Sequence, residues 1–485
     1  MTMDRLPGLL AATAMGVYLL LVAGATTAVT GAAAACVGWP LCAGGLSLST
    51  GGLSASAPVV IALGHRAVAV VVGLLVVVTA VVALRARPDR RVLAALGLAT
   101  LLFPVQAGLG AFLATAGGET TLATVAGVSL VARTLHLAVG LVIFGGLLAA
   151  LAWELEARTG DPDDTPENPP QGPDTTDNPP LDDGQAPDVP AWGEDPLRRA
   201  RLTATAYYRL TKPRLMWLLC LVAAAAMALA AGPSLSPRVV AVTLVAGALS
   251  IGASGTFNHV LERDIDRRMQ RTSDRPLAVD LVSVPNAVAF GTLLAVVSVG
   301  LFASINLLAG VLGLTAIVFY AVVYTLLLKP NTVQNTVVGG AAGALPALIG
   351  WAAVTGEIGL GGLGVAALIF LWTPAHFYNL ALAYEDDYER AGFPMLPVVR
   401  GETTTRRHIL WYLGATFAAA ASLVGLARLD WLYAATGVVV GAVFLWAVVR
   451  LHYERDESAA FRAFHASNAY LGTLLLAAVV DALVV

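Results

Sequence analysis

Thirteen separate runs of apolar residues, each long enough to cross a lipid bilayer, constrain the fold of this chain more than any other feature. A helix needs about 20 apolar residues to span the hydrocarbon core, where backbone polar groups must be satisfied within the spanning segment. The chain of 485 residues is 57% hydrophobic and only 13% charged, which is too apolar for a soluble protein of this length. We therefore predict an all-α polytopic membrane protein, surrounded by membrane lipid and not bound to nucleic acid. The runs lie at about 8–29, 57–84, 92–115, 124–152, 215–232, 237–257, 285–304, 306–328, 336–355, 361–383, 408–427, 429–450 and 464–485.

One polar segment, residues 161–197, divides these runs into a group of four and a group of nine. It contains 11 of the 32 acidic residues and 10 of the 25 prolines, with no lysine or arginine. A segment of this composition cannot bury a core, so we predict a disordered, solvated linker. We expect a four-span domain at 1–155, the linker at 156–200 and a nine-span domain at 201–485.

Lysine and arginine are concentrated in alternate connections between the runs. Positive charge is almost absent from the connections near 30–56, 116–123 and 355–360. Basic residues fill the connections near 85–91, 198–214, 263–275, 390–407 and 450–462. Because basic loops stay on the cytoplasmic side, we predict a multi-pass protein of the plasma membrane whose amino terminus, linker and 258–284 loop are cytoplasmic. The carboxyl terminus is then outside.

Three oxygen-bearing side chains, Asn258, Glu262 and Asp266, follow one another at intervals of four residues where an apolar run ends. This interval keeps them on one face of a helix. Oxygen ligands of this kind can hold Mg²⁺ against a phosphate group. Ionisable groups at a membrane boundary cost free energy, so such a cluster usually serves a function.

Five arginines share the loop that begins at Asn258, and guanidinium groups bind phosphate oxygens in pairs. The positive-inside rule alone also explains the arginines, although it does not explain the spacing of Asn258, Glu262 and Asp266. The five are Arg263, Arg267, Arg268, Arg271 and Arg275.

A second polar loop lies on the same predicted side of the membrane. His376 and Asn379 precede it within an apolar run, and Asp386 and Asp387 follow just past the end of that run. Lys329 ends another run on the same side. We expect these groups to converge with the first loop over one cavity. His376 is either a contact for a bound ligand or a packed, hydrogen-bonded histidine of the membrane interior.

The second part of the chain resembles the intramembrane UbiA prenyltransferase superfamily and, within it, the haem O synthases, which are protohaem IX farnesyltransferases. The resemblance covers about 200–485 and is carried by residues 208–214, 258–276, 339–356 and 371–401. It implies a nine-helix UbiA-type bundle. The first motif of the family is Asn-x3-Asp-x3-Asp, whereas this chain has Glu262 at the middle position. The second acidic motif is incomplete, because His376-Phe-Tyr-Asn379 stands where its first aspartate falls.

The resemblance also implies the reaction. Farnesyl diphosphate would lose its diphosphate, and the vinyl group of haem B would attack the farnesyl cation to make haem O for haem-copper oxidase biogenesis. His376 would contact the haem. Mg²⁺ would be held by Asn258, Glu262 and Asp266, with Asp386 or Asp387. The cations that would neutralise the leaving diphosphate are Lys212, Lys329, Arg267 and Arg268.

The first part of the chain places His65 and His136 inside two different spans at similar depth. Two histidines on facing helices can ligate a haem iron from both sides. Over about 10–152 this part resembles one four-helix half of haem A synthase. The matching positions are 30–31, 36–42, 65–66, Gln106, 109–110 and 135–136. Ala62 stands where that family carries a glutamate.

That substitution leaves three interpretations of the first part: a haem-binding or haem-delivery module, half of a site completed by a second chain, or a degenerate remnant. Haem A synthase or terminal oxidase assembly factors are the partners that the resemblance implies. Cys36 and Cys42 share a short connection on the outer side, where they either form a disulfide or remain free thiols, and the compartment favours the disulfide.

Two other functions fit parts of the pattern. One is a UbiA-type transferase with an aromatic or glycerol-phosphate lipid acceptor, and the other is a non-catalytic haem carrier or insertion factor. The incomplete second motif argues against the first alternative. Asn258, Asp266 and the arginines argue against the second, because a carrier has no need to ionise a diphosphate.

Overall fold

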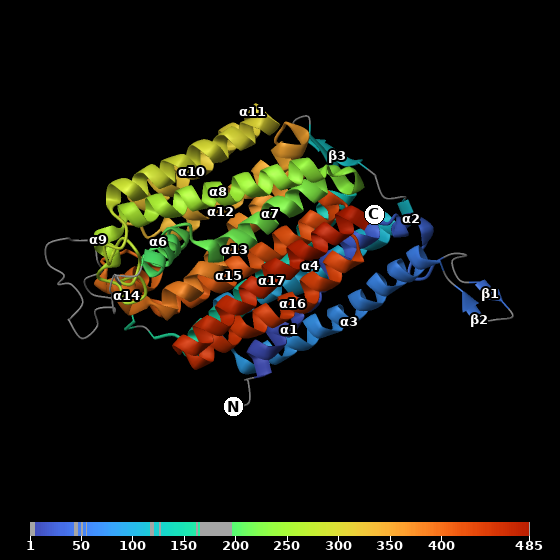
Figure 1. Ribbon diagram of the computed structural model, residues 1–485. Coiled ribbons are helices and arrows are strands. Elements are labelled where there is room, and N and C mark those ends of the chain that lie inside the picture. Colours follow the sequence, from blue (N-terminus) through green and yellow to red (C-terminus); the bar gives the residue numbers. More distant parts are fainter. Residues whose placement is uncertain are drawn as a thin grey trace. The chain divides into compact units, whose positions relative to one another are not determined.

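The computed structural model describes residues 5–42, 47–49, 52–54, 56–116, 121–125, 128–161, 163–164 and 196–484. Within these residues, thirteen helices are long and apolar enough to cross a membrane. Four of them precede residue 160 and nine follow residue 212, so the predicted all-α, polytopic fold is confirmed (Figure 1). Most of the predicted linker, residues 165–195, lies outside the described residues.

Helices in the first part of the chain are joined by short connections, two of which contain a small antiparallel hairpin. The predicted fourth span began at 124, but Thr124, Val125 and Val128–Val131 lie in strands instead, since most of these residues are β-branched and favour strands. The helices are α1 (Arg5–Val29), α2 (Ala32–Ala35), α3 (Ala57–Ala86), α4 (Arg90–Ala116) and α5 (Ala132–Thr159). The strands are β1 (Ser47–Ser49), β2 (Gly52–Ser54), β3 (Thr121–Val125) and β4 (Val128–Val131).

The second part of the chain is helical in its described residues. Several of its helices begin with a proline in the first turn, where the missing N–H costs nothing. The elements are α6 (Pro196–Leu210), α7 (Pro213–Ala231), η1 (Gly232–Ser234), α8 (Pro237–Leu261), α9 (Arg263–Asp266), α10 (Val284–Ile305), α11 (Leu307–Val318), the π-helical η2 (Phe319–Leu328), α12 (Asn335–Thr355), α13 (Leu360–Ala383), α14 (Glu385–Arg390), α15 (Leu396–Ala427), α16 (Trp431–Glu454) and α17 (Glu457–Val484).

Packing divides the chain into two compact units that do not coincide with the division at the linker. Unit 1 consists of Met1–Gly160 and Leu410–Glu454, and unit 2 of Asp161–Ile409 and Arg455–Val485. In unit 1, Tyr18 of α1 stacks on Phe417 of α15 with ring centroids 4.7 Å apart. The second part of α15 and the whole of α16 therefore pack with the first four spans.

In unit 2, α8 packs against α10, and α12 packs against both α7 and α13. Helix α17 packs against α7 and α13. In Figure 1, α8 and α10 run side by side and both end near α9. The polar loops that follow α8 and α13 therefore belong to one packed bundle, which is the frame for the candidate site.

Helix α15 is interrupted at Gly401, whose φ of 79° and ψ of 163° are outside helical values. The helix resumes after this break, so its first N–H groups need a partner outside the helix. Asp164 provides one, because its Oδ2 accepts from the Thr403 N–H at 2.6 Å. The Asp161 N–H in turn donates to Thr403 Oγ1 at 3.0 Å. Residues 156–159 of the predicted linker thus belong to α5, and Asp161 and Asp164 are bonded within unit 2.

We predict that Gly401→Ala destabilises the protein by about 1–3 kcal/mol, the usual cost of a side chain in this glycine-only backbone region. A Cβ at this position would also lie 2.4 Å from Asp164 Oδ1. Thermal unfolding in detergent should show a lower midpoint. Gly425→Ala is the control in the same helix, because nothing lies within 4 Å of its added Cβ. Equal midpoints for the two variants would contradict the strain at Gly401.

Candidate functional site

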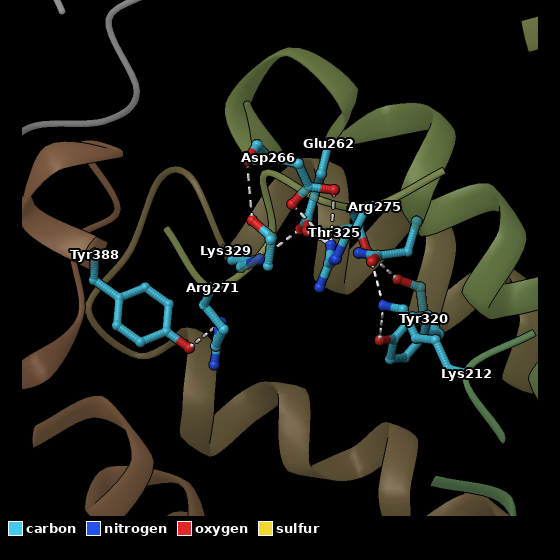
Figure 2. A network of polar contacts seen from close by, with 11 residues as sticks. Lys212, Glu262, Asp266, Arg271, Arg275, Tyr320, Thr325, Lys329 and Tyr388 are labelled. Atoms are coloured by element: carbon cyan, nitrogen blue, oxygen red, sulfur yellow. Dashed lines mark hydrogen bonds and ion pairs between the residues drawn. The ribbon is translucent and has the colours of Figure 1, made fainter. Parts of the chain in front are cut away.

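The end of α8 carries the three predicted oxygen ligands, and all three are buried. Asn258 and Asp266 are each 2% exposed, and Glu262 is 4% exposed. Helical hydrogen bonds continue past the end of α8, since the Glu262 N–H donates to Asn258 O at 2.9 Å and the Asp266 N–H to Glu262 O at 2.7 Å. The three side chains therefore keep the common face that their spacing predicts, as Figure 2 shows for Glu262 and Asp266.

Asn258 is held between a cation and a hydroxyl. Lys212 Nζ donates to Asn258 Oδ1, and Asn258 Nδ2 donates to Thr325 Oγ1 at 3.0 Å. The phenolic oxygen of Tyr320 lies 3.3 Å from Lys212 Nζ. Lys212 reaches this position because α8 has a glycine opposite it, Gly255, at which an added Cβ would lie 3.2 Å from Lys212 Cγ.

The two carboxylates are each paired with a cation from another part of unit 2. Lys329 Nζ donates to Glu262 Oε1 at 2.6 Å. Arg275 Nη1 donates to both Asp266 oxygens at 2.8 Å and lies 3.8 Å from Glu262 Oε2. Such short contacts between ionised groups are the strong kind of hydrogen bond. Each predicted ligand is thus in contact with at least one cationic side chain.

Burial sets the electrostatics of this cluster. Burial, followed by repulsion from Arg275, lowers the pKa of Lys212 to about 7. Burial alone would raise the pKa of Glu262, but Lys329 and Lys212 lower it overall. Burial raises the pKa of Asp266 in spite of Arg275. With every group ionised, the three cationic side chains and two carboxylates give a formal excess of one positive charge, which favours an anion.

The predicted arginines have different partners in the structure, and only some of them contact the predicted ligands. Arg267 donates to Ala278 O at 2.8 Å and to Asp280 Oδ2 at 2.8 Å, which braces its own loop. Arg268 is half-buried in the same loop. Arg275 is the guanidinium that contacts the carboxylates, although the sequence did not distinguish it from the other four. Tyr320 and Thr325 were also missed, and their only signal was polarity within an apolar run.

The second loop does not bring its aspartates to the first set of ligands. Asp386 is exposed. Asp387 is buried, and its two oxygens accept from the backbone N–H groups of Gln270 and Arg271 at 3.0 Å each. Among the residues that the structure describes, no three His, Cys, Asp or Glu side chains are grouped to hold a metal ion. A metal site at the first loop would therefore depend on Asn258 and on ligand oxygens.

His376 of α13 is enclosed by neighbours within unit 2. Its Nδ1 lies 2.6 Å from Ser467 Oγ. Its ring stacks between Trp372, at 4.2 Å between centroids, and Phe464, at 4.3 Å. Of the two interpretations of His376, this environment supports the packed, hydrogen-bonded histidine.

The two histidines of the first part both lie in unit 1, His65 on α3 and His136 on α5. Each ring packs over a glycine: an added Cβ at Gly24 would lie 3.3 Å from His65 Cε1, and one at Gly110 would lie 3.2 Å from His136 Cε1. The Nδ1 atoms of both rings are buried without a hydrogen-bond partner. Gln106 Nε2 lies 3.3 Å from His136 Nε2.

The short connection before His65 is held by the next residue, Arg66. Arg66 Nη2 donates to Cys36 O at 2.9 Å, and Nη1 donates to Pro40 O at 3.0 Å. Cys36 and Cys42 form the disulfide that their compartment favoured. Cys220, in contrast, is a free thiol. The disulfide loop and His65 are therefore joined through one guanidinium.

Comparisons with known proteins agree with both parts of the chain. The UbiA prenyltransferase family model matches residues 218–472, and a model described as a cytochrome oxidase assembly protein matches 55–174. A Haloarcula marismortui relative named protoheme IX farnesyltransferase is 60% identical over 98% of this chain and 98% of its own length. A Haloquadratum walsbyi relative of the same name is 58% identical over 99% of this chain and 97% of its own length.

Two solved structures match part of the chain at low identity. A UbiA homologue from Archaeoglobus fulgidus bound to GPP and Mg²⁺ has a TM-score of 0.43 and 16% identity, covering 56% of this chain and 99% of its own. A digeranylgeranylglyceryl phosphate synthase has a TM-score of 0.49 and 14% identity, covering 58% of this chain and 99% of its own. The family model, which matches more than half of the chain, and the full-length relatives establish that this chain belongs to the UbiA prenyltransferase family.

Proposed function

We propose that this protein transfers the farnesyl group of farnesyl diphosphate to a vinyl group of haem B, which makes haem O in the membrane. The observation that carries this proposal is the buried cluster of Asn258, Glu262 and Asp266, with its excess of positive charge. The name of the full-length relatives supports haem as the acceptor. A haem carrier would have no use for such a cluster, whereas diphosphate ionisation requires one.

Asn258, Glu262 and Asp266 suit Mg²⁺ because they offer only oxygen donors, which this ion prefers, and Mg²⁺ normally takes few protein ligands beside phosphate oxygens. They would hold the ion together with the diphosphate. The chemistry supplied by a bound Mg²⁺ would be electrostatic stabilisation of the departing diphosphate. The sequence also predicted Asp386 and Asp387 as ligands, but the exposure of Asp386 and the backbone hydrogen bonds of Asp387 argue against that role.

The cations of the site would then turn from the ligands to the phosphate oxygens. Lys212, Lys329 and Arg275 already surround the ligands, so a short movement of each side chain would place it on the diphosphate. Preorganised cations in a water-poor site stabilise developing negative charge more than solvent does. Arg267 and Arg268 were expected in this role, but the bonds of Arg267 to Ala278 and Asp280 make Arg275 the better candidate.

The bonds made and broken define the reaction. The bond between farnesyl C1 and the diphosphate oxygen breaks, and diphosphate leaves with the electron pair. A haem vinyl carbon bonds to C1, and water adds a hydroxyl to the other vinyl carbon and releases a proton. The product carries a hydroxyethylfarnesyl side chain. His376 is proposed to lie beside the haem as a packing residue, since Trp372 and Phe464 cover its ring.

A second proposed function belongs to unit 1, where His65 and His136 would bind a haem through both faces of its iron. The observation that favours it is that the Nδ1 atoms of both rings are buried without hydrogen-bond partners. Buried polar groups of this kind usually have a partner, so their presence suggests a ligand. The match to the cytochrome oxidase assembly model covers both histidines.

The location and partners are proposals of the same kind. We expect the amino terminus and both polar loops on the cytoplasmic side of the plasma membrane, where soluble farnesyl diphosphate is made. Haem A synthase or oxidase assembly factors are the expected protein partners, because haem O must be passed on in the membrane.

We expect the full chain to produce haem O in cells that lack their own haem O synthase. Haems extracted from such cells and analysed by mass spectrometry should contain haem O, and Asp266→Ala should reduce it by about 10²-fold or more, as loss of a charge-stabilising group does. Asp264→Asn is the matched control, because Asp264 is close in sequence and its side chain is 75% exposed. Cells with only haem B would refute the function, and haem O at the parent level from Asp266→Ala would refute the metal assignment.

Substitutions of Glu262 show whether haem O synthesis depends on the charge of this side chain or on its length. Glu262→Asp restores the residue usual in the family and keeps the charge, so we expect it to retain haem O synthesis within about tenfold of the parent. Glu262→Gln keeps the shape but removes the charge that pairs with Lys329, so we expect a loss comparable to that of Asp266→Ala. Rates of haem O formation in membranes supplied with farnesyl diphosphate would measure both. Equal rates for Glu262→Gln and the parent would exclude Glu262 from the site.

The haem site of unit 1 predicts a spectroscopic signature. The purified full chain, titrated with haem, should give a low-spin absorption spectrum that is lost in His65→Ala and in His136→Ala. His452→Ala is the control, since His452 is a buried histidine of unit 1 whose Nδ1 is already bonded to Val448 O at 2.9 Å. A low-spin spectrum that survives His136→Ala would show that another residue ligates the iron.

A further inference from the structure

The second polar loop is fastened to the first by one carboxylate. Asp387, at 6% exposure, accepts two consecutive backbone N–H groups through its two oxygens, from Gln270 and Arg271 at 3.0 Å each. Arg390 Nη1 adds a third contact to Oδ1 at 3.2 Å. A carboxylate that accepts several such bonds is strongly held, and a metal ion would have to compete for the same lone pairs.

A second fastening lies beside the first. The Arg271 guanidinium is 4.7 Å from the Tyr384 ring centroid and 5.2 Å from that of Tyr388. It also donates to the Tyr388 hydroxyl at 3.1 Å, as Figure 2 shows. Cation–π contacts of this kind are strongest when desolvated. Arg271 is therefore engaged by the second loop and not directed at the carboxylates of the first.

An apolar cluster lies beneath these polar contacts. Met269, which is 1% exposed, packs with Tyr388, Phe393 and Met395 from the second loop and its neighbours. Burial of these apolar side chains stabilises the association of the two loops, and it does so without any bound ion. The two loops are thus joined by backbone bonds, an aromatic cage and a small core.

The fastened segment lies between the two members of the key ion pair. Asp266 O accepts from Met269 N at 3.4 Å and from Thr272 Oγ1 at 3.1 Å. The backbone N–H of Arg275 donates to Thr272 O at 3.0 Å. Residues 269–272 are therefore bonded to the backbone of both Asp266 and Arg275.

We infer that Asp387 is a positioning residue, which fastens the first loop so that Arg275 meets Asp266, and that metal binding is left to the first loop. This inference rests on the proposed diphosphate chemistry. It replaces a metal-ligand role for Asp387 with a mechanical one. Asp386, one residue away and exposed, takes part in neither.

Two measurements on the purified full-length protein separate these roles. The first is Mn²⁺ binding in the presence of inorganic diphosphate, followed by the electron paramagnetic resonance signal of free Mn²⁺. The second is the rate at which trypsin cleaves after the arginines of residues 263–275 in the absence of ligands, which reports opening of the loop. The variants are Asp387→Asn, Asp266→Asn and the matched control Asp386→Asn.

We expect Asp387→Asn to speed tryptic cleavage by about tenfold, as an opening that costs 1.4 kcal/mol less would. Mn²⁺ affinity should change by less than about threefold. Asp266→Asn should weaken Mn²⁺ binding by about tenfold or more, the scale on which contacts around a bound metal act. Asp386→Asn should leave both measurements unchanged. Weakened Mn²⁺ binding in Asp387→Asn with unchanged cleavage would overturn the inference, as would no change in either.

Tyr388→Phe decides the outcome if Asp387→Asn alters both measurements or fails to fold. It removes the hydroxyl that Arg271 bonds and leaves every carboxylate in place. Faster cleavage in Tyr388→Phe would support fastening, whereas cleavage at the parent rate would overturn it. The cleavage arm needs neither metal nor substrate. A parent protein that binds no Mn²⁺ would therefore refute the proposed function while leaving the fastening role to be judged on cleavage alone.

Discussion

The interaction on which the rest of the site depends is the pairing of Glu262 and Asp266 with Lys329 and Arg275 in a buried environment. Ionised groups removed from water cost several kcal/mol each unless they are paired with good geometry. Glu262 is paired with Lys329, and Asp266 is paired with Arg275. Both cations come from segments other than α8, α9 and the junction between them, where the carboxylates lie. The folded arrangement of the loops is therefore required before these residues can be buried at all.

Of the three cations around the predicted ligands, Lys212 differs from Lys329 and Arg275 in that it makes no ion pair among the described residues. It bonds the neutral amide of Asn258, so burial and the nearby Arg275 lower its pKa to about 7. An anion placed beside it would favour its charged form and remove that penalty, which couples the charge of Lys212 to ligand binding. The site is thus electrostatically incomplete in a way that a diphosphate would correct.

Sequence reasoning predicted the features that depend on local periodicity and composition. The spacing of Asn258, Glu262 and Asp266 was sufficient to place them on one buried face, because the helical hydrogen bonds continue through the junction at Glu262. The number of spans was also predicted correctly, because hydropathy is a property of local composition. The roles of Arg275 and Asp387 did not follow, because they depend on a loop held by contacts over 100 residues apart in sequence. The packing of α15 and α16 with the first four spans is equally long-range.

The π-helical segment η2 shows why part of the site was invisible in the sequence. Its backbone bonds reach back five residues, so Lys329 N donates to Tyr324 O at 2.8 Å. The side-chain hydroxyl of Thr325 also donates to the backbone of this segment, to Tyr320 O at 2.9 Å. The wider turn alters which residues share a face, and π-helical turns are frequent at functional sites. Tyr320, Thr325 and Lys329 consequently reach Lys212, Asn258 and Glu262, respectively. A regular helix would turn about 100° per residue and separate these side chains by a different angle. The polar residues of an apparently uniform apolar run therefore act together only because that run departs from α-helical geometry.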